Sequence, residues 1–258
     1  MERRRIKIQN TLIDVLDAQQ TLAETERYIR DRRPLHLMGV NADKINMLNK
    51  NERLRDIVNG CGIINADGAS VVLAARWLGT PLPGRVAGID LMLDLVRLAA
   101  QEHYRVFLLG AKQEILEKTA DVLLGKFPGL DIAGMRNGYF RQEKWDAVAE
   151  EIRACGAQIV FVGISSPLKE YLVEYFMQEK HINCVFMGVG GSFDVISGAV
   201  KRAPVWMQEH NLEWFFRFLQ EPVRLFRRYF IGNWKFVFSV WREKRQRETC
   251  QKRKRAKK

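Results

Sequence analysis

The chain has 258 residues, which is long enough for one large α/β domain, or two small lobes, with a substantial buried core. A hydrophobic content of 47% and a mean hydropathy of -0.23 are typical of a soluble globular protein and exclude a disordered one. The net charge of +12 lies entirely in residues 217–258, which hold 15 Lys and Arg against 3 Asp and Glu, whereas residues 1–216 are neutral.

Apolar runs and amphipathic stretches alternate along the body of the chain. Helices are expected over residues 17–32, 43–58, 68–78, 89–102, 113–126, 143–154 and 167–179. Strands are expected at residues 35–38, at a run ending with 63–64, and at residues 106–110, 130–133, 159–162 and 184–187. Short apolar strands separated by such helices favour βαβ units. We therefore predict an α/β fold with a mostly parallel sheet flanked by helices.

The pattern changes from Pro204 onward, where two or three helices are expected with breaks near Pro222 and Gly232. We divide the chain into an α/β catalytic body (residues 1–200), a helical amphipathic appendage (201–246) and a basic tail (247–258) that we expect to be disordered. Aromatic residues alternate with Arg in the appendage. They fit either a helical cap packed on the body or helices lying in a membrane interface. Nucleic acid is the competing partner for a basic arm, but the dense Trp and Phe content favours an anionic membrane surface.

The cysteines and the N-terminal segment indicate the cellular compartment in which the protein is expected. The four cysteines are widely spaced: Cys61, Cys155, Cys184 and Cys250. This spacing argues against a structural zinc site, and the first three are interpreted as buried thiols in a reducing compartment. The N-terminal MERRRIKIQN lacks the apolar core of a signal peptide. The run 236–241 is far shorter than the roughly 18 to 20 residues that span a bilayer. We expect a cytoplasmic protein.

An acidic residue stands where a strand-like run gives way to a helix, in Asn65-Ala66-Asp67-Gly68. Asp67 fits a helix N-cap, because Asp side chains accept from the first free backbone N–H groups of a helix. It equally fits a catalytic position, because α/β proteins bind ligands at the carboxyl ends of their strands. Asn41 ends the neighbouring strand-like run and is expected to lie close to Asp67.

Two further stretches are candidates for binding. The loop TPLPGRVAG (80–88) is stiffened by prolines and carries one Arg, Arg85. The stretch MGVGGSFDVISG (187–198) places Gly188, Gly190 and Gly191 after a strand and before Asp194. Such glycines allow backbone N–H groups to approach a phosphate, although a plain tight turn explains them as well.

Several familiar motifs are absent. No GxGxxG follows Leu109 and no GxxxxGK[ST] occurs, so dinucleotide-binding and P-loop proteins are disfavoured. No DxD pair occurs, so a nucleotide-sugar enzyme of this sequence would hold its leaving diphosphate with Arg and helix dipoles rather than with a metal. The four histidines are scattered and are interpreted as structural. We therefore expect no metal and no cofactor.

The motifs together carry a family resemblance. They are NADG (65–68), GTPLPGRVAGIDLM (79–92), GYF (138–140), GVGGSFDVISG (188–198) and KRAPVWMQEHNLEWFFRFLQEPVRLFRRY (201–229). In this order they resemble the WecG/TagA/CpsF glycosyltransferases, the bacterial N-acetylmannosaminyltransferases of wall teichoic acid and enterobacterial common antigen synthesis, with their exopolysaccharide relatives. The resemblance implies a Rossmann-like body with a membrane-docking appendage. It also implies inverting transfer of a sugar from a UDP-sugar to a polyprenyl-diphosphate-linked sugar at the inner face of the bacterial plasma membrane.

The resemblance also implies roles for particular residues. Asp67 stands at the position of the proposed general base, and Asn41 and Arg85 stand at active-site positions, with Arg85 facing the diphosphate. Gly188, Gly190, Gly191 and Asp194 fall in the nucleotide-binding stretch. The arginines expected to close over the lipid diphosphate are in the appendage: Arg217, Arg224, Arg227 and Arg228.

Two positions depart from the family pattern. Gly39-Val40-Asn41 stands in place of Thr-x-Asn, and Pro167-Leu168-Lys169-Glu170 in place of Pro-Lys-Gln-Glu. Both departures concern which sugar is donated. We expect Lys169 to bind substrate, where its charge would suit a uronic acid carboxylate or a phosphate; the alternative is a Lys that is simply solvated.

The expected mechanism is a single displacement in which Asp67 takes the proton of the acceptor hydroxyl and UDP leaves from the opposite face of the sugar. An N-cap carboxylate is a weak base, so its proton transfer would come late in the displacement. N-acetylmannosamine is the favoured donor sugar, and a glucosyl or uronosyl donor is the alternative. The rival from another class is a non-catalytic nucleotide- or nucleic-acid-binding protein with a basic arm. The sequence leaves the acceptor lipid, the linkage and the oligomeric state open.

Overall fold

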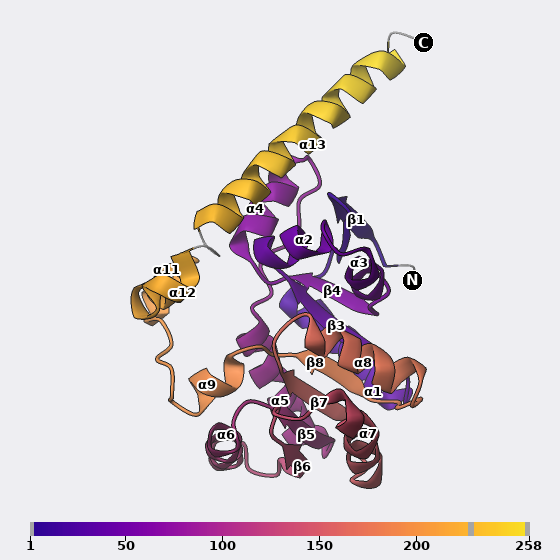
Figure 1. Ribbon diagram of the computed structural model, residues 1–258, viewed down its shortest axis with the longest axis vertical. Coiled ribbons are helices and arrows are strands. Elements are labelled where there is room, and N and C mark those ends of the chain that lie inside the picture. The colour runs from indigo at the N-terminus through magenta and orange to yellow at the C-terminus, as the bar shows by residue number, and fades with distance from the viewer. Residues whose placement is uncertain (1–2, 227–229, 256–258) are drawn as a thin grey trace.

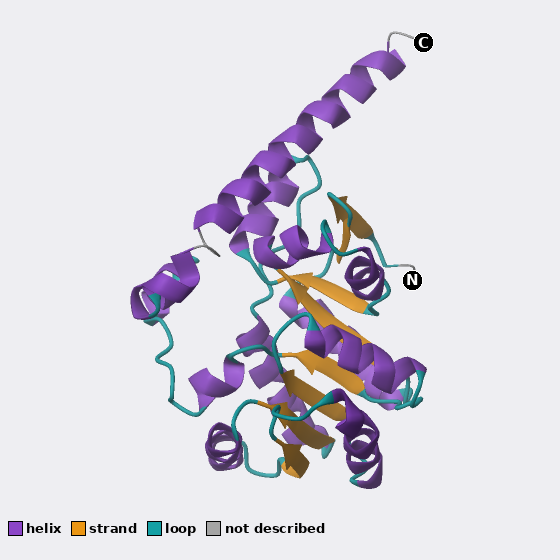
Figure 2. Ribbon diagram, in the orientation of Figure 1, coloured by secondary structure: helices purple, strands orange, loops and turns teal. Residues whose placement is uncertain are grey.

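A computed structural model describes residues 3–226 and 230–255, which form two sheets surrounded by helices (Figure 1). The larger sheet has six parallel strands in the order β4-β3-β8-β7-β5-β6, and the smaller one is the antiparallel hairpin β1-β2. The predicted α/β fold with a parallel sheet flanked by helices is therefore confirmed (Figure 2).

The elements follow one another in a regular βα rhythm. The strands are β1 (Arg5–Ile8), β2 (Thr11–Asp14), β3 (Leu35–Val40), β4 (Ile63–Ala66), β5 (Arg105–Gly110), β6 (Asp131–Arg136), β7 (Ile159–Gly163) and β8 (Val185–Gly188). The helices of the body are α1 (Ala18–Arg30), α2 (Ala42–Leu48), α3 (Glu52–Asn59), α4 (Ala69–Trp77), α5 (Gly88–Glu102), α6 (Gln113–Lys126), α7 (Trp145–Ala154), α8 (Leu168–Gln178) and α9 (Ser192–Ile196). A short 3-10 turn, η1 (Gln142–Lys144), precedes α7. The C-terminal helices are α10 (Val205–Glu209), α11 (Glu213–Gln220), α12 (Pro222–Phe226) and α13 (Gly232–Arg255).

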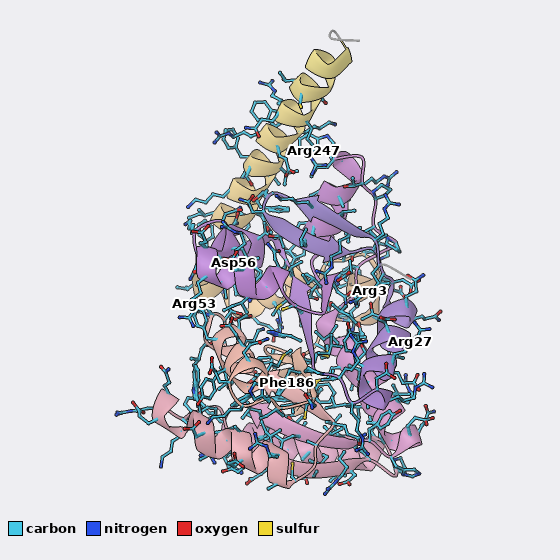
Figure 3. All side chains as sticks on the ribbon, turned by 90° about the vertical axis from the view of Figure 1, so that its right-hand side faces the viewer. Arg3, Arg27, Arg53, Asp56, Phe186 and Arg247 are labelled. Atoms are coloured by element: carbon cyan, nitrogen blue, oxygen red, sulfur yellow. The ribbon has the colours of Figure 1, made fainter. Side chains whose placement is uncertain are left out.

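The alternation of side chains along each strand builds a core on both faces of the sheet. Leu35 and Leu37 of β3 pack on the face covered by α1, α5 and α6. Met38 and Val40 of the same strand pack on the opposite face, with α2, α3 and α4. Helices α7 and α8 cover the rest of that second face, where Phe186 of β8 is fully buried (Figure 3). The sheet is thus buried on both sides, as parallel sheets generally are.

The helix predicted over residues 43–58 is in fact two helices. Asn51 has an extended backbone, and its side chain accepts a hydrogen bond from the N–H of Leu54 at 3.0 Å. This side-chain cap starts α3 anew after α2 has ended, which is the usual effect of Asn at a helix N-terminus.

The hairpin β1-β2 was not expected from the sequence. Its apolar residues Ile6 and Ile8 alternate with charged ones, and they are buried against the core that contains α2, α3 and α4. The turn is made by Gln9 with a positive φ of 54°, without the Gly that usually marks such a hairpin. The alternation of charged and apolar side chains over residues 5–8 was the sequence signal that could have indicated a strand here.

Helix α13 packs on the body through one face and then continues beyond it (Figure 1). Phe236 and Val240 are 1% exposed and belong to the core around β1, β2 and α2. Arg247, labelled in Figure 3, donates to the carbonyl of Lys7 in strand β1 of the hairpin at 2.6 Å. The appendage is therefore attached to the body at its C-terminal helix. The chain beyond residue 246, expected to be a disordered tail, continues as part of α13 as far as Arg255.

The cysteines are free thiols. Cys61 and Cys184 are buried and Cys155 is partly buried, in line with the sequence interpretation, while Cys250 is exposed. Burial raises the pKa of the Cys184 thiol to about 12 and also raises that of Cys61, so both remain protonated and inert at neutral pH.

Candidate active site

Asp67 and Asn41 lie side by side at the carboxyl edge of the sheet. Strands β3 and β4 are parallel, with Val40 opposite Ala66, so the next residue of each strand emerges at the same level. A Cβ atom built on Gly68 would lie 3.0 Å from the Cβ of Asn41. The expectation that Asn41 neighbours the acidic residue follows directly from this register.

Gly39 makes room for the Asp67 side chain. A Cβ atom at Gly39 would lie 3.2 Å from the Cβ of Asp67, which is closer than most real contacts. The residue that departs from the family pattern at this position therefore lies directly beneath the candidate base. Asn41 has a structural role as well, because its Oδ1 accepts from the N–H of Lys44 at 2.9 Å and caps α2.

Asp67 is not the N-cap of the helix that follows it. Gly68 takes that position in α4, without a side-chain hydrogen bond. Instead, Oδ1 of Asp67 accepts from the N–H of Gly88, the first residue of α5, at 3.1 Å. The carboxylate therefore satisfies one of the free N–H groups at the start of a different helix. The interpretation of Asp67 as the N-cap of the following helix is therefore wrong, and its interpretation as a catalytic residue stays a prediction.

Arg85 lies next to Asp67 and links it to the appendage. Its Nε donates to the backbone carbonyl of Asp67 at 2.7 Å. Its Nη2 donates to Oε2 of Glu213, on α11, at 2.8 Å. Arg202 approaches the other oxygen of Glu213 at 3.4 Å. Burial alone raises the pKa of the Glu213 carboxyl, but the two guanidinium groups more than offset this and hold the pKa below its usual value.

A second group of residues surrounds the glycine turn after β8. A Cβ atom at Gly188 would lie 3.0 Å from Nζ of Lys169, and one at Gly191 would lie 3.2 Å from Nη2 of Arg217 and 3.6 Å from Oδ2 of Asp194. Gly190 between them has a φ of +54°, a conformation that favours glycine. The ammonium group of Lys169 and the guanidinium group of Arg217 thus lie against a turn that contains three glycines.

The two groups lie at the same edge of the sheet because β8 pairs with β3. The structure brings Asn41, Asp67 and Arg85 together at the ends of β3 and β4. It brings Lys169, the glycine turn, Asp194 and Arg217 together at the end of β8. Helix α11 joins the groups, since Glu213 reaches Arg85 and Arg217 lies over Gly191. Of the other predicted arginines, Arg224 falls within α12 but its side chain is outside the described part of the chain, as are Arg227 and Arg228.

Glu213 and Arg202 are site residues that sequence reasoning missed. The spacing of Glu213 and Arg217, four residues apart on an aromatic helix, places them on one face and was the available signal. Nothing in the sequence indicates that this face meets Arg85.

Lys169 lies beside a buried cluster formed by Lys44, Ser166 and Glu170. Lys44 forms an ion pair with Glu170, whose side chain is fully buried, and Ser166 donates to the same carboxylate oxygen at 2.9 Å. Nζ of Lys169 lies 3.8 Å from that oxygen. Burial raises the pKa of Glu170, but the charges of Lys169 and Lys44 and the hydrogen bonds from Lys44 and Ser166 bring it below its usual value. The carboxylate is ionised and fixes both ammonium groups.

His36 is buried near this cluster. Its burial should make the free energy of unfolding depend on pH. Burial, opposed by Glu170, lowers its pKa from 6.5 to about 4. Above pH 6.5 the imidazole is neutral in both the folded and the unfolded chain, so the free energy of unfolding does not depend on its titration. Between pH 6.5 and about 4 only the unfolded chain binds the proton, so the free energy of unfolding decreases as the pH falls. We expect His36 to cost about 3 kcal/mol of unfolding free energy over this window.

Urea unfolding of His36→Leu against the wild type across this pH window measures that loss. The variant should have a shallower pH slope, while His181→Asn, at an exposed histidine, should keep the wild-type slope. Parallel slopes for all three proteins would show that His36 does not set the acid limit.

An exposed apolar surface extends over the C-terminal helices. Trp234 and Phe238 of α13 are 74% and 58% exposed, and they project from the side opposite the buried Phe236. Trp77 of α4 is 42% exposed and lies against the same helix further along, with Nζ of Lys244 at 4.8 Å from its ring. Further exposed apolar side chains are Val205, Trp206, Trp214, Phe215, Leu219, Val223, Phe226, Phe230, Ile231 and Val237. Among the described residues, no helix is both long and apolar enough to cross a bilayer.

A protein-family model matches almost the whole chain. The family model Glyco_tran_WecG, described as the glycosyl transferase WecG/TagA/CpsF family, matches residues 6–250. The matched range contains the whole six-stranded sheet, both groups of site residues and helices α10 to α12.

Proposed function

The chain belongs to the WecG/TagA/CpsF family of glycosyltransferases, which act in cell-surface polysaccharide synthesis, and from this premise we propose its donor, its acceptor and its mechanism. The donor is a UDP-sugar of the N-acetylmannosamine type, and the acceptor is a polyprenyl-diphosphate-linked sugar. The reaction takes place at the inner face of the bacterial plasma membrane, where the protein is peripheral.

The observation that carries the proposal is that Asp67 and Arg85 lie together at the carboxyl edge of a parallel sheet. Asp67 is placed by the register of β3 and β4, and Arg85 is held to it by the hydrogen bond to its backbone carbonyl. Asp67 can serve as the one base that an inverting displacement needs, and such a displacement requires no covalent intermediate. The guanidinium suits the diphosphate that leaves.

The proposed reaction is one displacement at the anomeric carbon. Asp67 takes the proton of the acceptor hydroxyl as its oxygen bonds to that carbon, and the bond between the carbon and the diphosphate oxygen breaks. Arg85, with Arg217 over the glycine turn, neutralises the charge that develops on the departing UDP. Asn41, Gly188, Gly190, Gly191 and Asp194 line the donor side. No metal has a part in this scheme, since the sequence has no DxD pair to bind one.

The exposed apolar surface supports membrane attachment. Its Trp and Phe side chains suit the boundary between headgroups and acyl chains, and the cationic residues around them suit anionic lipids.

The test of the proposed function is release of UDP from a panel of UDP-sugars in the presence of a polyprenyl-diphosphate-linked sugar. We expect release that depends on the acceptor and persists in EDTA. Absence of release with every donor, together with RNA binding that weakens steeply with salt, would instead identify a non-catalytic nucleic-acid-binding protein.

One observation favours an anionic donor as a second candidate. Lys169 replaces an uncharged family residue and stands over the turn at Gly188. An ammonium group at this position would pair with the carboxylate of a uronic acid.

If so, Lys169→Gln should lower kcat/KM for a UDP-uronic acid by about ten- to a hundredfold, the usual value of a hydrogen bond to a charged group. Its effect on an uncharged UDP-sugar should be much smaller. Lys118→Gln, on the exposed side of α6, is the matched control. An equal loss of kcat/KM on charged and uncharged donors would show that Lys169 does not determine which sugar is transferred.

A further inference from the structure

Asp67 is held from two sides by the loop that carries Arg85. Its carboxylate accepts from the N–H of Gly88 at 3.1 Å, and its backbone carbonyl accepts from Nε of Arg85 at 2.7 Å. Residues 84–90 therefore fix both the side chain and the main chain of the candidate base. Whatever holds this loop also holds Asp67.

The appendage holds the same loop from outside. Oε2 of Glu213 accepts from Nη2 of Arg85 at 2.8 Å, and its Oε1 lies 3.4 Å from Nε of Arg202. Nη2 of Arg202 donates to Oδ1 of Asp90 at 2.6 Å. Asp90 is in the first turn of α5, two residues after Gly88. The contacts thus run from Asp67 through Arg85, Glu213 and Arg202 back to the helix that binds the Asp67 carboxylate.

Burial gives this chain of contacts more strength than an ordinary surface pair. The side chains of Arg85, Glu213 and Arg202 are 23%, 18% and 25% exposed. The two guanidinium groups lower the pKa of Glu213, so the carboxylate is charged at neutral pH. Charge-assisted hydrogen bonds between partly buried groups are stronger and more directional than exposed ion pairs.

We propose that Glu213 is a positioning residue of the active site. Its hydrogen bond to Arg85, which Arg202 helps to orient, holds residues 84–90, and so the guanidinium group of Arg85 and the carboxylate of Asp67, in their working geometry. The kinetic part of this proposal rests on the proposed glycosyl transfer.

The physical reason is preorganisation. A guanidinium group stabilises a departing diphosphate only if it already points to where the charge develops. Without Glu213, the hydrogen bond to the Asp67 carbonyl is the remaining described contact that directs Arg85. Glu213 would then affect turnover only by way of Arg85, and removing both should cost no more than removing Arg85.

The test is a double-mutant cycle on turnover. We expect Glu213→Gln to lower kcat about tenfold and Arg85→Ala to lower it about a hundredfold or more. The double variant should be no slower than Arg85→Ala alone, because residues that act as one unit are not additive. Multiplied losses in the double variant, or wild-type turnover of Glu213→Gln, would overturn the proposal.

Two further variants distinguish the positioning role from a general defect in folding. Arg202→Gln removes the second partner of Glu213 and should also lose turnover non-additively with Arg85→Ala. Glu209→Gln, at an exposed position of α10, is the matched control and should keep wild-type turnover. An additive loss for Arg202→Gln would contradict the proposal even if Glu213→Gln fails to fold.

Hydrogen–deuterium exchange separates this proposal from the proposed function. Glu213→Gln should speed amide exchange in peptides covering residues 84–90, while peptides of β5 and α6 keep their wild-type rates. This readout requires no activity, so a wild-type protein without transferase activity would refute the proposed function alone. Unchanged exchange in residues 84–90 would refute the positioning role.

Discussion

Asp67→Asn should lower turnover at least a hundredfold while leaving the affinity for UDP-sugar nearly unchanged, since general base catalysis contributes about 10² to 10⁴ in rate. The substitution keeps the shape of the side chain, and the amide oxygen can still accept from the N–H of Gly88. The loop that carries Arg85 should therefore stay in place. What the variant lacks is a group that can take the proton from the acceptor hydroxyl.

Steady-state release of UDP gives the turnover, and calorimetric titration with the donor gives the affinity. Asp94→Asn, two turns into the same helix that binds the Asp67 carboxylate, is the matched control, because Asp94 pairs with Arg97 on the surface. It should keep wild-type turnover. If Asp67→Asn turns over as fast as Asp94→Asn, Asp67 is not the base.

The second large effect concerns the membrane. Trp234→Ser combined with Phe238→Ser should reduce binding to vesicles of phosphatidylcholine and phosphatidylglycerol by a hundredfold or more. Burying each aromatic side chain in the interface contributes about 1.5 to 3 kcal/mol, and the two together about 3 to 6. Both residues point away from the body, so the fold should be unaffected. Turnover on a lipid-linked acceptor in vesicles should fall with binding, while turnover on a detergent-dispersed acceptor should not.

Sedimentation of the protein with vesicles measures this binding. Leu124→Ser, at an exposed apolar position of α6 that is 46% exposed, is the control and should bind like the wild type. Vesicle binding by the double variant at the wild-type level would show that this face of α13 does not contact lipid.

The sequence was informative wherever local pattern decides structure. The parallel sheet followed from apolar runs separated by amphipathic helices, and the proximity of Asn41 and Asp67 followed from two strands that end at one edge. In both cases the signal lies within a few residues of the feature that it predicts.

Contacts between distant segments could not be predicted in the same way. The partner of the Asp67 carboxylate is the start of α5, 21 residues later, and the partner of Arg85 is 128 residues later. Helix periodicity shows that Glu213 and Arg217 share a face, but not what that face meets. Likewise, a buried ion pair such as Lys44 with Glu170 has no pattern in the sequence, because its members lie on different helices.

The same limitation affected the division into body and appendage. From the sequence we placed the end of the body at residue 200, which suggests a truncation there as a test of the appendage. Phe236 and Val240 are buried in the core that contains β1, β2 and α2, so such a cut would expose part of that core. Substitutions on the exposed face of α13 therefore test the appendage better than truncation does.

The most direct test of the mechanism is the anomeric configuration of the product, measured by proton NMR on the disaccharide released from the lipid. A single displacement with Asp67 as base predicts a glycosidic bond of the configuration opposite to that of the UDP-sugar. Retention of the donor configuration would require a second nucleophile and would contradict this account.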